Sequence, residues 1–228
     1  MTSILRLFLL PPLLIRLLLS ALATTFLPNA AAADEIQLIA TDGLVDFYPQ
    51  FLSKIESQAL FDRIHLAENF DQNEIVLFGK RIKVPRLEAY YALNGEVYGY
   101  SGQELSAKPF PNYLNELRIR VEQQTGQTYN ALLINYYRDG KDSNGWHADN
   151  EKSLGKNPSI ASLSLGAERH FELKHLTNGT LKKMLLTDGS LLHMHGALQH
   201  HYKHQLPKMT GLSQARLNLT FRWVQPST

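Results

Sequence analysis

The segment from Arg216 to Trp223 alternates apolar and polar side chains without a break. A period of two is the pattern of a β-strand that has one face in a core. The apolar face would hold Leu217, Leu219, Phe221 and Trp223. The other face would hold Arg216, Asn218, Thr220 and Arg222. The segment therefore predicts a strand of a layered β-structure near the end of the chain.

The rest of the chain extends this pattern. Apolar residues recur at helical spacing in residues 48–67 (Phe51, Ile55, Leu60, Ile64) and in residues 112–124, and residues 161–165 alternate like a strand. Turn signals separate the segments of the second half: Asp139-Gly140, Asn144-Gly145, Asn178-Gly179 and Asp188-Gly189. Two helices followed by many short strands predict an α+β fold that is mainly β, a double-stranded β-helix (jelly-roll) barrel with N-terminal supporting helices.

Residues 1–33 differ from the remainder, since they are apolar and contain no acidic side chain. They could be a secretory signal, a transit-like leader or residues from an upstream start codon. Pro11-Pro12 and Arg16 interrupt the apolar stretch, so it contains no span long enough to cross a bilayer. We expect one domain over residues 34–228.

Charge and cysteine content restrict the function classes. The net charge of +2 comes from Arg6 and Arg16, and the remaining chain carries 21 basic and 21 acidic side chains. Overall charge therefore gives no support to nucleic-acid binding, although Lys80, Arg81, Lys83 and Arg86 cluster without an acid between them. The absence of cysteine excludes thiol nucleophiles and Cys-ligated metals. Any metal must be held by His, Asp and Glu.

His147 and Asp149 are two residues apart, so on a strand both point to one face and can share a metal ion. Such a pair also arises by chance, and His170 with Glu172 is a second example, best explained as a strand that buries Phe171 and Leu173. Two histidines and a carboxylate leave three positions open on Fe(II). The candidates for a third ligand are His193, His195, His200, His201 and His204. Spacing does not choose among them; His193 and His195 could bind metal from a strand, but a partly exposed polar face is the more common explanation.

Arginines on the inner face of a barrel strand are costly to bury unless an anion satisfies them. Arg216 and Arg222 would occupy that face, and a guanidinium forks onto a carboxylate. Asn135 and Tyr137 share a face of another predicted strand and offer an amide and a phenol. A dicarboxylate ligand would satisfy this set, and a solvated polar sheet face is the alternative.

The chain resembles the AlkB-type dealkylating dioxygenases. The matching elements occur in family order: Asn135-Tyr-Tyr137, His147-Ala-Asp149, His204-Gln-Leu-Pro207 and Arg216-Leu-Asn-Leu-Thr-Phe-Arg222. The resemblance implies Fe(II) bound by His147, Asp149 and His204, with O2 and 2-oxoglutarate as co-substrates. It also implies that 2-oxoglutarate contacts Asn135, Tyr137, Arg216, Asn218 and Arg222, with Arg216 on the distal carboxylate.

The reaction that the resemblance implies is oxidative demethylation of 1-methyladenine or 3-methylcytosine in DNA, with RNA as a further candidate. It would yield succinate, CO2 and formaldehyde and would repair alkylation damage. A base within a duplex must be flipped out or supplied in a single strand to reach buried iron. The alternative is a 2-oxoglutarate dioxygenase that acts on a protein or a small molecule.

Further segments resemble substrate-binding parts of the same relatives. Residues 98–102 are similar to an aromatic segment that stacks on the base, through Tyr98 and Tyr100, and Glu151 matches an acidic position that faces the base. Residues 77–80 resemble a hairpin finger in which Phe78 would fill the gap left by the base. Lys80, Arg81, Lys83 and Arg86 would contact phosphates. Packed core residues and solvated surface are the alternatives.

We expect the mature protein to act in the cytoplasm, because Fe(II) and 2-oxoglutarate are intracellular. We also expect a monomer without stable membrane association. The leader leaves export or organelle targeting open.

Overall fold

The computed structural model describes residues 34–77 and 79–226. The major sheet contains β1 (Ile36–Ile39), β2 (Leu44–Tyr48), β5 (Leu87–Ala92), β8 (Ala131–Tyr137), β10 (Ile160–Gly166), β13 (Leu191–His195) and β15 (Arg216–Arg222). The minor sheet contains β9 (Asn144–His147), β11 (Arg169–His175), β12 (Leu181–Leu186) and β14 (Tyr202–Leu206). Two hairpins are formed by β3 (Glu74–Leu77) with β4 (Lys80–Lys83), and by β6 (Tyr98–Tyr100) with β7 (Gln103–Leu105). The helices are α2 (Lys54–Ala67), α3 (Asn112–Thr125), the single-turn α4 (Leu198–His201) and the 3-10 turn η1 (Lys152–Leu154).

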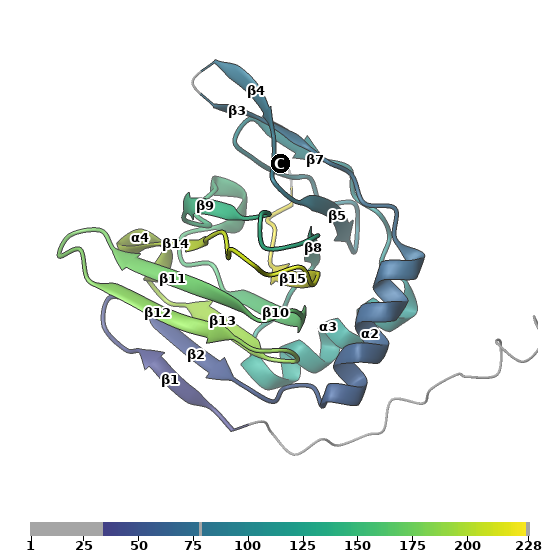
Figure 1. Ribbon diagram of the computed structural model, residues 1–228. Coiled ribbons are helices and arrows are strands. Elements are labelled where there is room, and N and C mark those ends of the chain that lie inside the picture. Colours follow the sequence, from purple (N-terminus) through teal and green to yellow (C-terminus); the bar gives the residue numbers. More distant parts are fainter. Residues whose placement is uncertain (1–33, 78, 227–228) are drawn as a thin grey trace, which may run out of the picture. The chain divides into compact units, whose positions relative to one another are not determined.

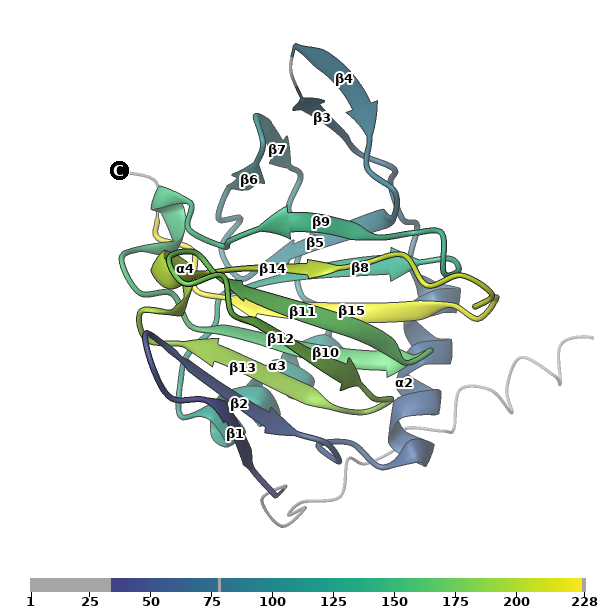
Figure 2. The same ribbon diagram turned by 60° about the vertical axis from the view of Figure 1, so that its left-hand side comes forward.

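The two sheets face each other as the halves of a jelly roll (Figures 1 and 2). The strand order is β1-β2-β13-β10-β15-β8-β5 in the major sheet and β12-β11-β14-β9 in the minor sheet, with antiparallel neighbours. Neighbours distant in sequence, such as β8 and β15, show that the chain crosses between the sheets. The predicted mainly-β jelly roll is confirmed.

Helices α2 and α3 cover the outer face of the major sheet, away from the minor sheet (Figure 2). A core cluster joins Leu60 and Ile64 of α2 and Leu114 of α3 to Leu219 of β15. The first helix was expected over residues 48–67, but α2 begins at Lys54 because Ser53 and Glu56 form a capping box. Ile55 is exposed rather than in the core.

A second core cluster fills the space between the sheets. It includes Leu133, Ile160 and Leu192 of the major sheet and Leu173 and Leu206 of the minor sheet. Polar residues replace apolar ones toward one end of this layer, and there a cavity opens. The regular strands therefore bring side chains from both sheets to one cavity.

The β3–β4 hairpin projects from the end of the barrel that carries β5 and β9 (Figures 1 and 2). Every described residue of β4 is exposed. Phe78, the proposed wedge, lies outside the described residues, as does the leader of residues 1–33. Within the part of the chain that is described, no helix is both long and apolar enough to span a membrane.

Candidate active site

His147, Asp149 and His204 meet where β9 pairs with β14. His204 lies opposite His147 in this antiparallel pair, and Asp149 follows two residues after His147. The candidate ligand atoms of the three residues lie within 4.8 Å of one another. Nε2 of His147 is 3.7 Å from Oδ1 of Asp149, and the two imidazole centroids are 4.2 Å apart. The structure thus brings the three predicted ligands together through strand register.

Neighbouring groups fix the orientation and charge of this triad. Nδ1 of His147 donates to the Gly145 carbonyl at 2.8 Å, which leaves Nε2 as the nitrogen that faces Asp149. Burial would raise the pKa of Asp149, but the positive charge of Arg222 and the hydrogen bonds that it donates hold this pKa well below its usual range. Arg222 donates to Oδ2 of Asp149 at 2.8 Å from NH2 and at 3.2 Å from Nε.

The two histidines are neutral at neutral pH. Burial, then the nearby His147, lowers the pKa of His204 to about 3, and burial also lowers the pKa of His147. A neutral imidazole pair beside one carboxylate is the protonation state that a divalent metal needs. In addition, Nδ1 of His204 is buried and has no hydrogen-bond partner among the described residues. The donor set fits Fe(II).

The polar side chains of β15 line the part of the cavity that extends away from the triad. The register places Arg216 opposite Tyr137 and Asn218 opposite Asn135 on β8, and all four side chains line the same cavity of about 500 Å³. Arg222 lies at the triad end of the strand, where it holds Asp149. The alternation of β15 therefore produces the predicted polar wall. Trp223, expected on the apolar face, lies beyond the strand and is exposed.

Arg216 is a buried cation with incomplete partners. Only 1% of the residue is exposed, and NH2 donates to Ser164 Oγ at 2.9 Å. Its Nε and NH1 have no hydrogen-bond partner within the described chain. Burial lowers the pKa of Arg216 to about 10, so the side chain stays charged at neutral pH. Such a group favours an anionic ligand that can accept the free N–H bonds, and 2-oxoglutarate fits this end of the cavity.

Arg86 does not lie where it was predicted. The sequence grouped it with Lys80, Arg81 and Lys83 as a phosphate contact, but only 5% of Arg86 is exposed. NH2 forms an ion pair with Glu88 Oε1 at 2.9 Å, and Nε donates to Asn135 Oδ1 at 2.8 Å. A carboxylate partner inside the protein explains why this arginine is buried while its basic neighbours on β4 are exposed.

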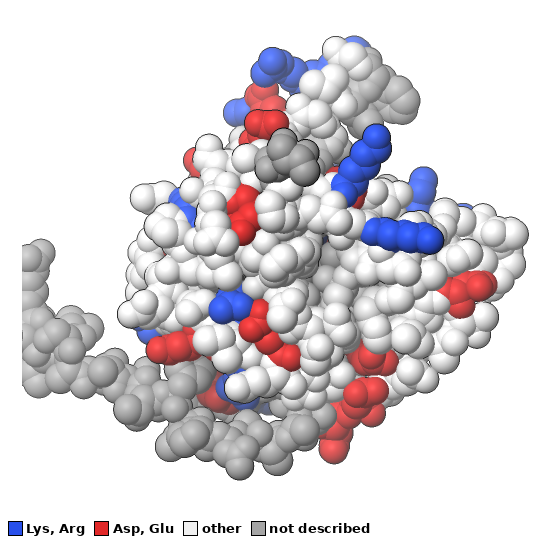
Figure 3. Space-filling view, turned by 180° about the vertical axis from the view of Figure 1, so that it is seen from behind, with Lys and Arg blue, Asp and Glu red and all other residues white. Residues whose placement is uncertain are grey.

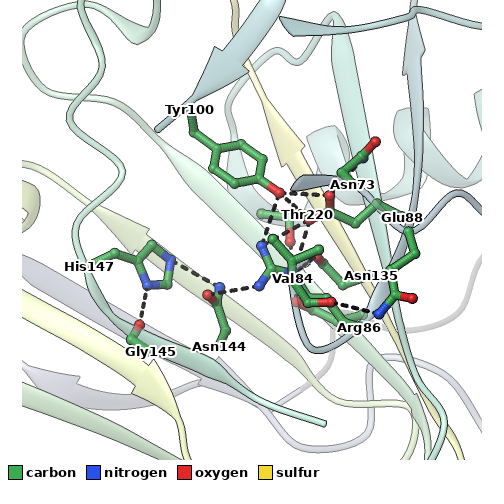
Figure 4. A network of polar contacts seen from close by, with 12 residues as sticks. Asn73, Val84, Arg86, Glu88, Tyr100, Asn135, Asn144, Gly145, His147 and Thr220 are labelled. Carbon is green, nitrogen blue, oxygen red and sulfur yellow. Dashed lines mark hydrogen bonds and ion pairs between the residues drawn. The ribbon is translucent and has the colours of Figure 1, made fainter. Parts of the chain in front are cut away.

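Figure 4 shows how the Arg86 network continues in two directions. On one side, the Tyr100 hydroxyl donates to Glu88 at 2.5 Å and accepts from Arg86 NH2 at 3.1 Å. On the other, Arg86 NH1 donates to Asn144 Oδ1 at 3.1 Å, and Asn144 Nδ2 is 3.3 Å from His147 Nε2. The network joins the candidate aromatic platform to the triad.

Glu88 and Asn144 were not among the residues predicted from the sequence. Glu88 is 1% exposed and also accepts from Asn73 Nδ2 at 2.8 Å. The i, i+2 spacing of Arg86 and Glu88 was the available signal, because it places both on one face of an extended segment. Asn144 carried only a turn signal with Gly145.

The other predicted substrate residues lie at the cavity or near its end. Tyr98 is buried beneath Arg222, whose guanidinium is 5.1 Å from the ring centroid, and Tyr100 is half-buried. Glu151 lines the cavity, and burial, then Asp149, raises its pKa. Lys80, Arg81 and Lys83 are exposed on the β3–β4 hairpin, where Figure 3 shows blue side chains at the tip.

The remaining histidine candidates lie outside the triad. His170 and Glu172 stand on β11 with Phe171 and Leu173 buried, as a plain strand predicts. His200 and His201 belong to α4. His193 is buried rather than partly exposed, on the opposite face of the major sheet from the cavity.

Comparisons of sequence and of fold relate this chain to known proteins. The family model described as the 2OG-Fe(II) oxygenase superfamily matches residues 45–222. The chain is 35% identical over 201 residues to DNA oxidative demethylase ALKBH2 of Bos taurus, covering 83% of this chain and 72% of that one. It is 39% identical over 195 residues to Alpha-ketoglutarate-dependent dioxygenase alkB homolog 3 of Rattus norvegicus, covering 80% of this chain and 64% of that one.

A solved structure, OsALKBH1, has the same fold, with a TM-score of 0.59 at 16% identity over 78% of this chain and 97% of that chain. The family match includes the triad and all strands of the two sheets except β1 and the first residue of β2. The chain therefore belongs to the 2OG-Fe(II) oxygenase superfamily and is an AlkB-type dioxygenase that uses Fe(II), 2-oxoglutarate and O2.

Proposed function

We propose that this protein demethylates alkylated bases in DNA by Fe(II)- and 2-oxoglutarate-dependent oxidation, as a DNA-repair activity. The observation that carries the proposal is a single cavity that holds both a His-Asp-His triad and a buried arginine with free N–H groups. The names of the ALKBH2 and ALKBH3 relatives support a dioxygenase, and ALKBH2 is named a DNA oxidative demethylase.

His147, Asp149 and His204 would hold the iron. When bound, Fe(II) and 2-oxoglutarate supply an oxidation in which one oxygen atom of O2 enters an N-methyl group, while 2-oxoglutarate loses CO2 and becomes succinate. The hydroxymethyl group then leaves the base as formaldehyde. The protein's part is positional: Gly145 holds the ring of His147, and Arg222 keeps Asp149 ionised.

Arg216 would bind the distal carboxylate of 2-oxoglutarate through Nε and NH1. Tyr137 lies beside it, with the Arg216 guanidinium 5.4 Å from the ring centroid. Asn135 Oδ1 accepts a hydrogen bond from Arg86 Nε, which leaves Asn135 Nδ2 as a donor, and Asn218 Nδ2 donates to Ser162 Oγ at 2.7 Å. Asn135 and Asn218 would thus line the dicarboxylate, and the NH1 group of Arg222, which is free among the described residues, would face the end nearest the triad.

The opposite end of the cavity would bind the methylated base. N1-methyladenine and N3-methylcytosine are cationic, so tyrosine faces and a carboxylate favour them over unmodified bases. Tyr100 would be a stacking platform whose hydroxyl is fixed by Glu88 and Arg86, with Tyr98 packed beside it at 6.4 Å between ring centroids. Glu151 has a buried Oε2 without a partner among the described side chains, and it would face the base.

The β3–β4 hairpin would engage the nucleic acid. Lys80, Arg81 and Lys83 are exposed and would contact phosphates, and Phe78 between the two strands would fill the gap that a flipped base leaves. The substrate in this scheme is DNA, single- or double-stranded, with RNA as a further candidate. We also propose an intracellular monomer without stable membrane association.

A panel of methylated substrates tests the proposal. The purified chain is incubated with Fe(II), 2-oxoglutarate and oligonucleotides that contain 1-methyladenine or 3-methylcytosine, as single- and double-stranded DNA and as RNA. Formaldehyde release that depends on a methylated DNA strand is expected. If 2-oxoglutarate turns over but no methylated nucleic acid stimulates it, the protein or small-molecule alternative replaces this assignment.

A further inference from the structure

A second cluster of two histidines and one carboxylate lies on the face of the major sheet opposite the cavity. It consists of Asp46 on β2 and of His193 and His195 on β13. The register places Asp46 directly opposite His193. Met194, between the histidines, points into the space between the sheets and lines the cavity. Alternation along β13 therefore directs both histidines to the other face.

The layout repeats that of the catalytic triad. In each cluster, two ligands stand at i and i+2 along one segment, and the third stands opposite one of them on the neighbouring strand. Nε2 of His195 is 2.7 Å from Oδ2 of Asp46, and Nδ1 of His193 is 3.8 Å from the same oxygen. The three candidate ligand atoms lie within 4.8 Å of one another.

The cluster has a carboxylate but no fixed cation. Among the described residues, the ion-pairing partners of Asp46 are the two histidines, with neither Lys nor Arg. The imidazole rings are parallel, with centroids 4.1 Å apart and 3° between their planes. Two protonated rings at this distance would repel each other, so protons on both histidines are a poor way to balance the carboxylate. His193 and His195 each present a ring nitrogen to the same oxygen of the buried Asp46 carboxylate.

Outer contacts orient these side chains as they do around bound metals. Nε2 of His193 is hydrogen-bonded to Ser159 Oγ at 2.8 Å, and Ser159 Oγ is 3.0 Å from the Tyr129 hydroxyl. This contact leaves Nδ1 for the cluster. Metal-binding histidines usually have such a partner on the second ring nitrogen.

We propose that Asp46, His193 and His195 form a second metal site that binds Zn²⁺ or a similar borderline divalent ion. The ligand atoms would be Oδ2 of Asp46, Nδ1 of His193 and Nε2 of His195. Two imidazoles and one carboxylate without a thiolate suit Zn²⁺. The side chain of His195 is 24% exposed, so a fourth, solvent-derived ligand can reach the ion. The site does not depend on the proposed demethylase activity.

A third cluster, Asp42 with His175 and His201, provides a matched control. Nδ1 of His175 already accepts the backbone N–H groups of Thr177 and Asn178. Asp42 is exposed, whereas Asp46 is buried. The loss of either carboxylate removes one charge beside two histidines, and only Asp46 belongs to the proposed site.

The test uses the full chain with His147→Ala and His204→Ala, which remove the active-site ligands. Isothermal titration with Zn²⁺ is expected to give one equivalent of tight binding. When Asp46→Asn or His195→Gln is added to this variant, the tight binding of Zn²⁺ should be lost. When Asp42→Asn is added instead, the variant should still bind one equivalent of Zn²⁺. Ser159→Ala should weaken this binding about 10- to 100-fold, the usual effect of removing an outer contact.

Thermal unfolding gives a second readout that does not depend on heat of binding. Zn²⁺ at a hundredfold excess over Kd should raise the Tm of the active-site variant by roughly 5–10 °C, and it should not raise the Tm after His195→Gln. His195 is partly exposed, so this variant is expected to fold even if Asp46→Asn does not. The proposal is overturned if the active-site variant binds no Zn²⁺, or if the equivalent persists in the His195→Gln protein.

Discussion

Each end of the cavity contains a buried arginine, Arg216 at one end and Arg86 at the other, and the two differ in their hydrogen-bond and ion-pair partners. We define the floor of the cavity as the triad with Asn135, Tyr137, Arg216, Asn218 and Arg222. At the floor, Arg216 donates to the Ser164 hydroxyl, and its Nε and NH1 have no hydrogen-bond partner among the described residues. At the rim, defined as Arg86, Glu88, Tyr98, Tyr100, Glu151 and the β3–β4 hairpin, Arg86 is paired with the carboxylate of Glu88.

This difference in partners indicates that Arg216 is suited to bind a ligand and that Arg86 has a structural role. A buried cation with unsatisfied donors destabilises the protein until an anion arrives, whereas a paired one is part of the folded structure. Under the proposed function, 2-oxoglutarate would complete the floor. The rim network is complete by itself and holds an aromatic surface in place.

Removing the triad carboxylate should have the most severe consequence. Asp149→Ala should reduce demethylation to the uncatalysed background, because it removes a metal ligand and leaves Arg222 without its anion. Formaldehyde release measures the activity, and anaerobic Fe(II) titration in the presence of 2-oxoglutarate measures the ligand role. Glu172→Ala, at the carboxylate of the other His-x-acid pair, should be close to wild type. Full iron binding by the Asp149→Ala protein would contradict the assignment.

Arg216→Met probes the arginine of the floor. We expect the KM for 2-oxoglutarate to rise roughly thirty- to a thousandfold, which corresponds to a loss of about 2–4 kcal/mol of binding free energy, because a buried charged interaction is removed. Because the free protein no longer carries an unsatisfied buried charge, its stability should rise by about 1 kcal/mol, or roughly 2–4 °C in Tm. Steady-state kinetics and thermal unfolding without ligand check the two parts. A large decrease in the stability of the ligand-free variant would show that Arg216 is a scaffold residue after all.

Arg86→Met should give the opposite stability result. Removing the partner of buried Glu88 is expected to cost about 3 kcal/mol of unfolding free energy, or roughly 6–12 °C in Tm. The KM for 2-oxoglutarate should change less than in the Arg216 variant. The double variant Arg86→Met/Glu88→Leu should recover much of the stability, since no buried charge is left unpaired. If the single variant is as stable as wild type, the distinction between floor and rim fails.

Charge reversal at the hairpin should have the mildest effect. Replacing Lys80, Arg81 and Lys83 by Glu should raise the KM for a methylated oligonucleotide about tenfold. The slope of log affinity against log salt should fall by about one for each phosphate that is no longer bound. Fe(II) and 2-oxoglutarate binding should stay unchanged. Lys182→Glu, at an exposed lysine of β12 in the minor sheet, is the control. Equal effects of both changes would indicate nonspecific charge rather than binding by the hairpin.

The sequence was more informative about the floor than about the rim. The floor residues lie on or beside paired strands, where a period of two determines which side chains share a face. The alternation of Arg216 to Arg222 therefore predicted a polar wall, and the pairing of β15 with β8 supplies Asn135 and Tyr137. The choice of His204 among five histidines needed the family resemblance, because its partner in space, His147, is far away in sequence.

The rim was harder to predict because tertiary contacts decide it. Arg86 follows Lys83 by three residues, so in the sequence it resembles part of a basic surface. In the structure it is buried, where it forms an ion pair with Glu88 and donates a hydrogen bond to Asn135. The pattern of charges along the sequence does not show which basic residue will have a buried carboxylate or amide as its partner. Similarly, Ile55 has helical spacing but lies on the exposed side of α2, because the face of the helix that packs on the sheet is the one with Leu60 and Ile64.

The ratio of products on one defined substrate is the decisive measurement for the proposed demethylation. A single-stranded DNA oligonucleotide with one 1-methyladenine is incubated with Fe(II), O2 and 2-oxoglutarate, and succinate and formaldehyde are both quantified. We predict equal amounts of the two products, one of each for every adenine restored, and neither product from the Asp149→Ala protein. Succinate formation that is the same with and without the methyl group, with no formaldehyde, would show that methylated DNA is not the substrate.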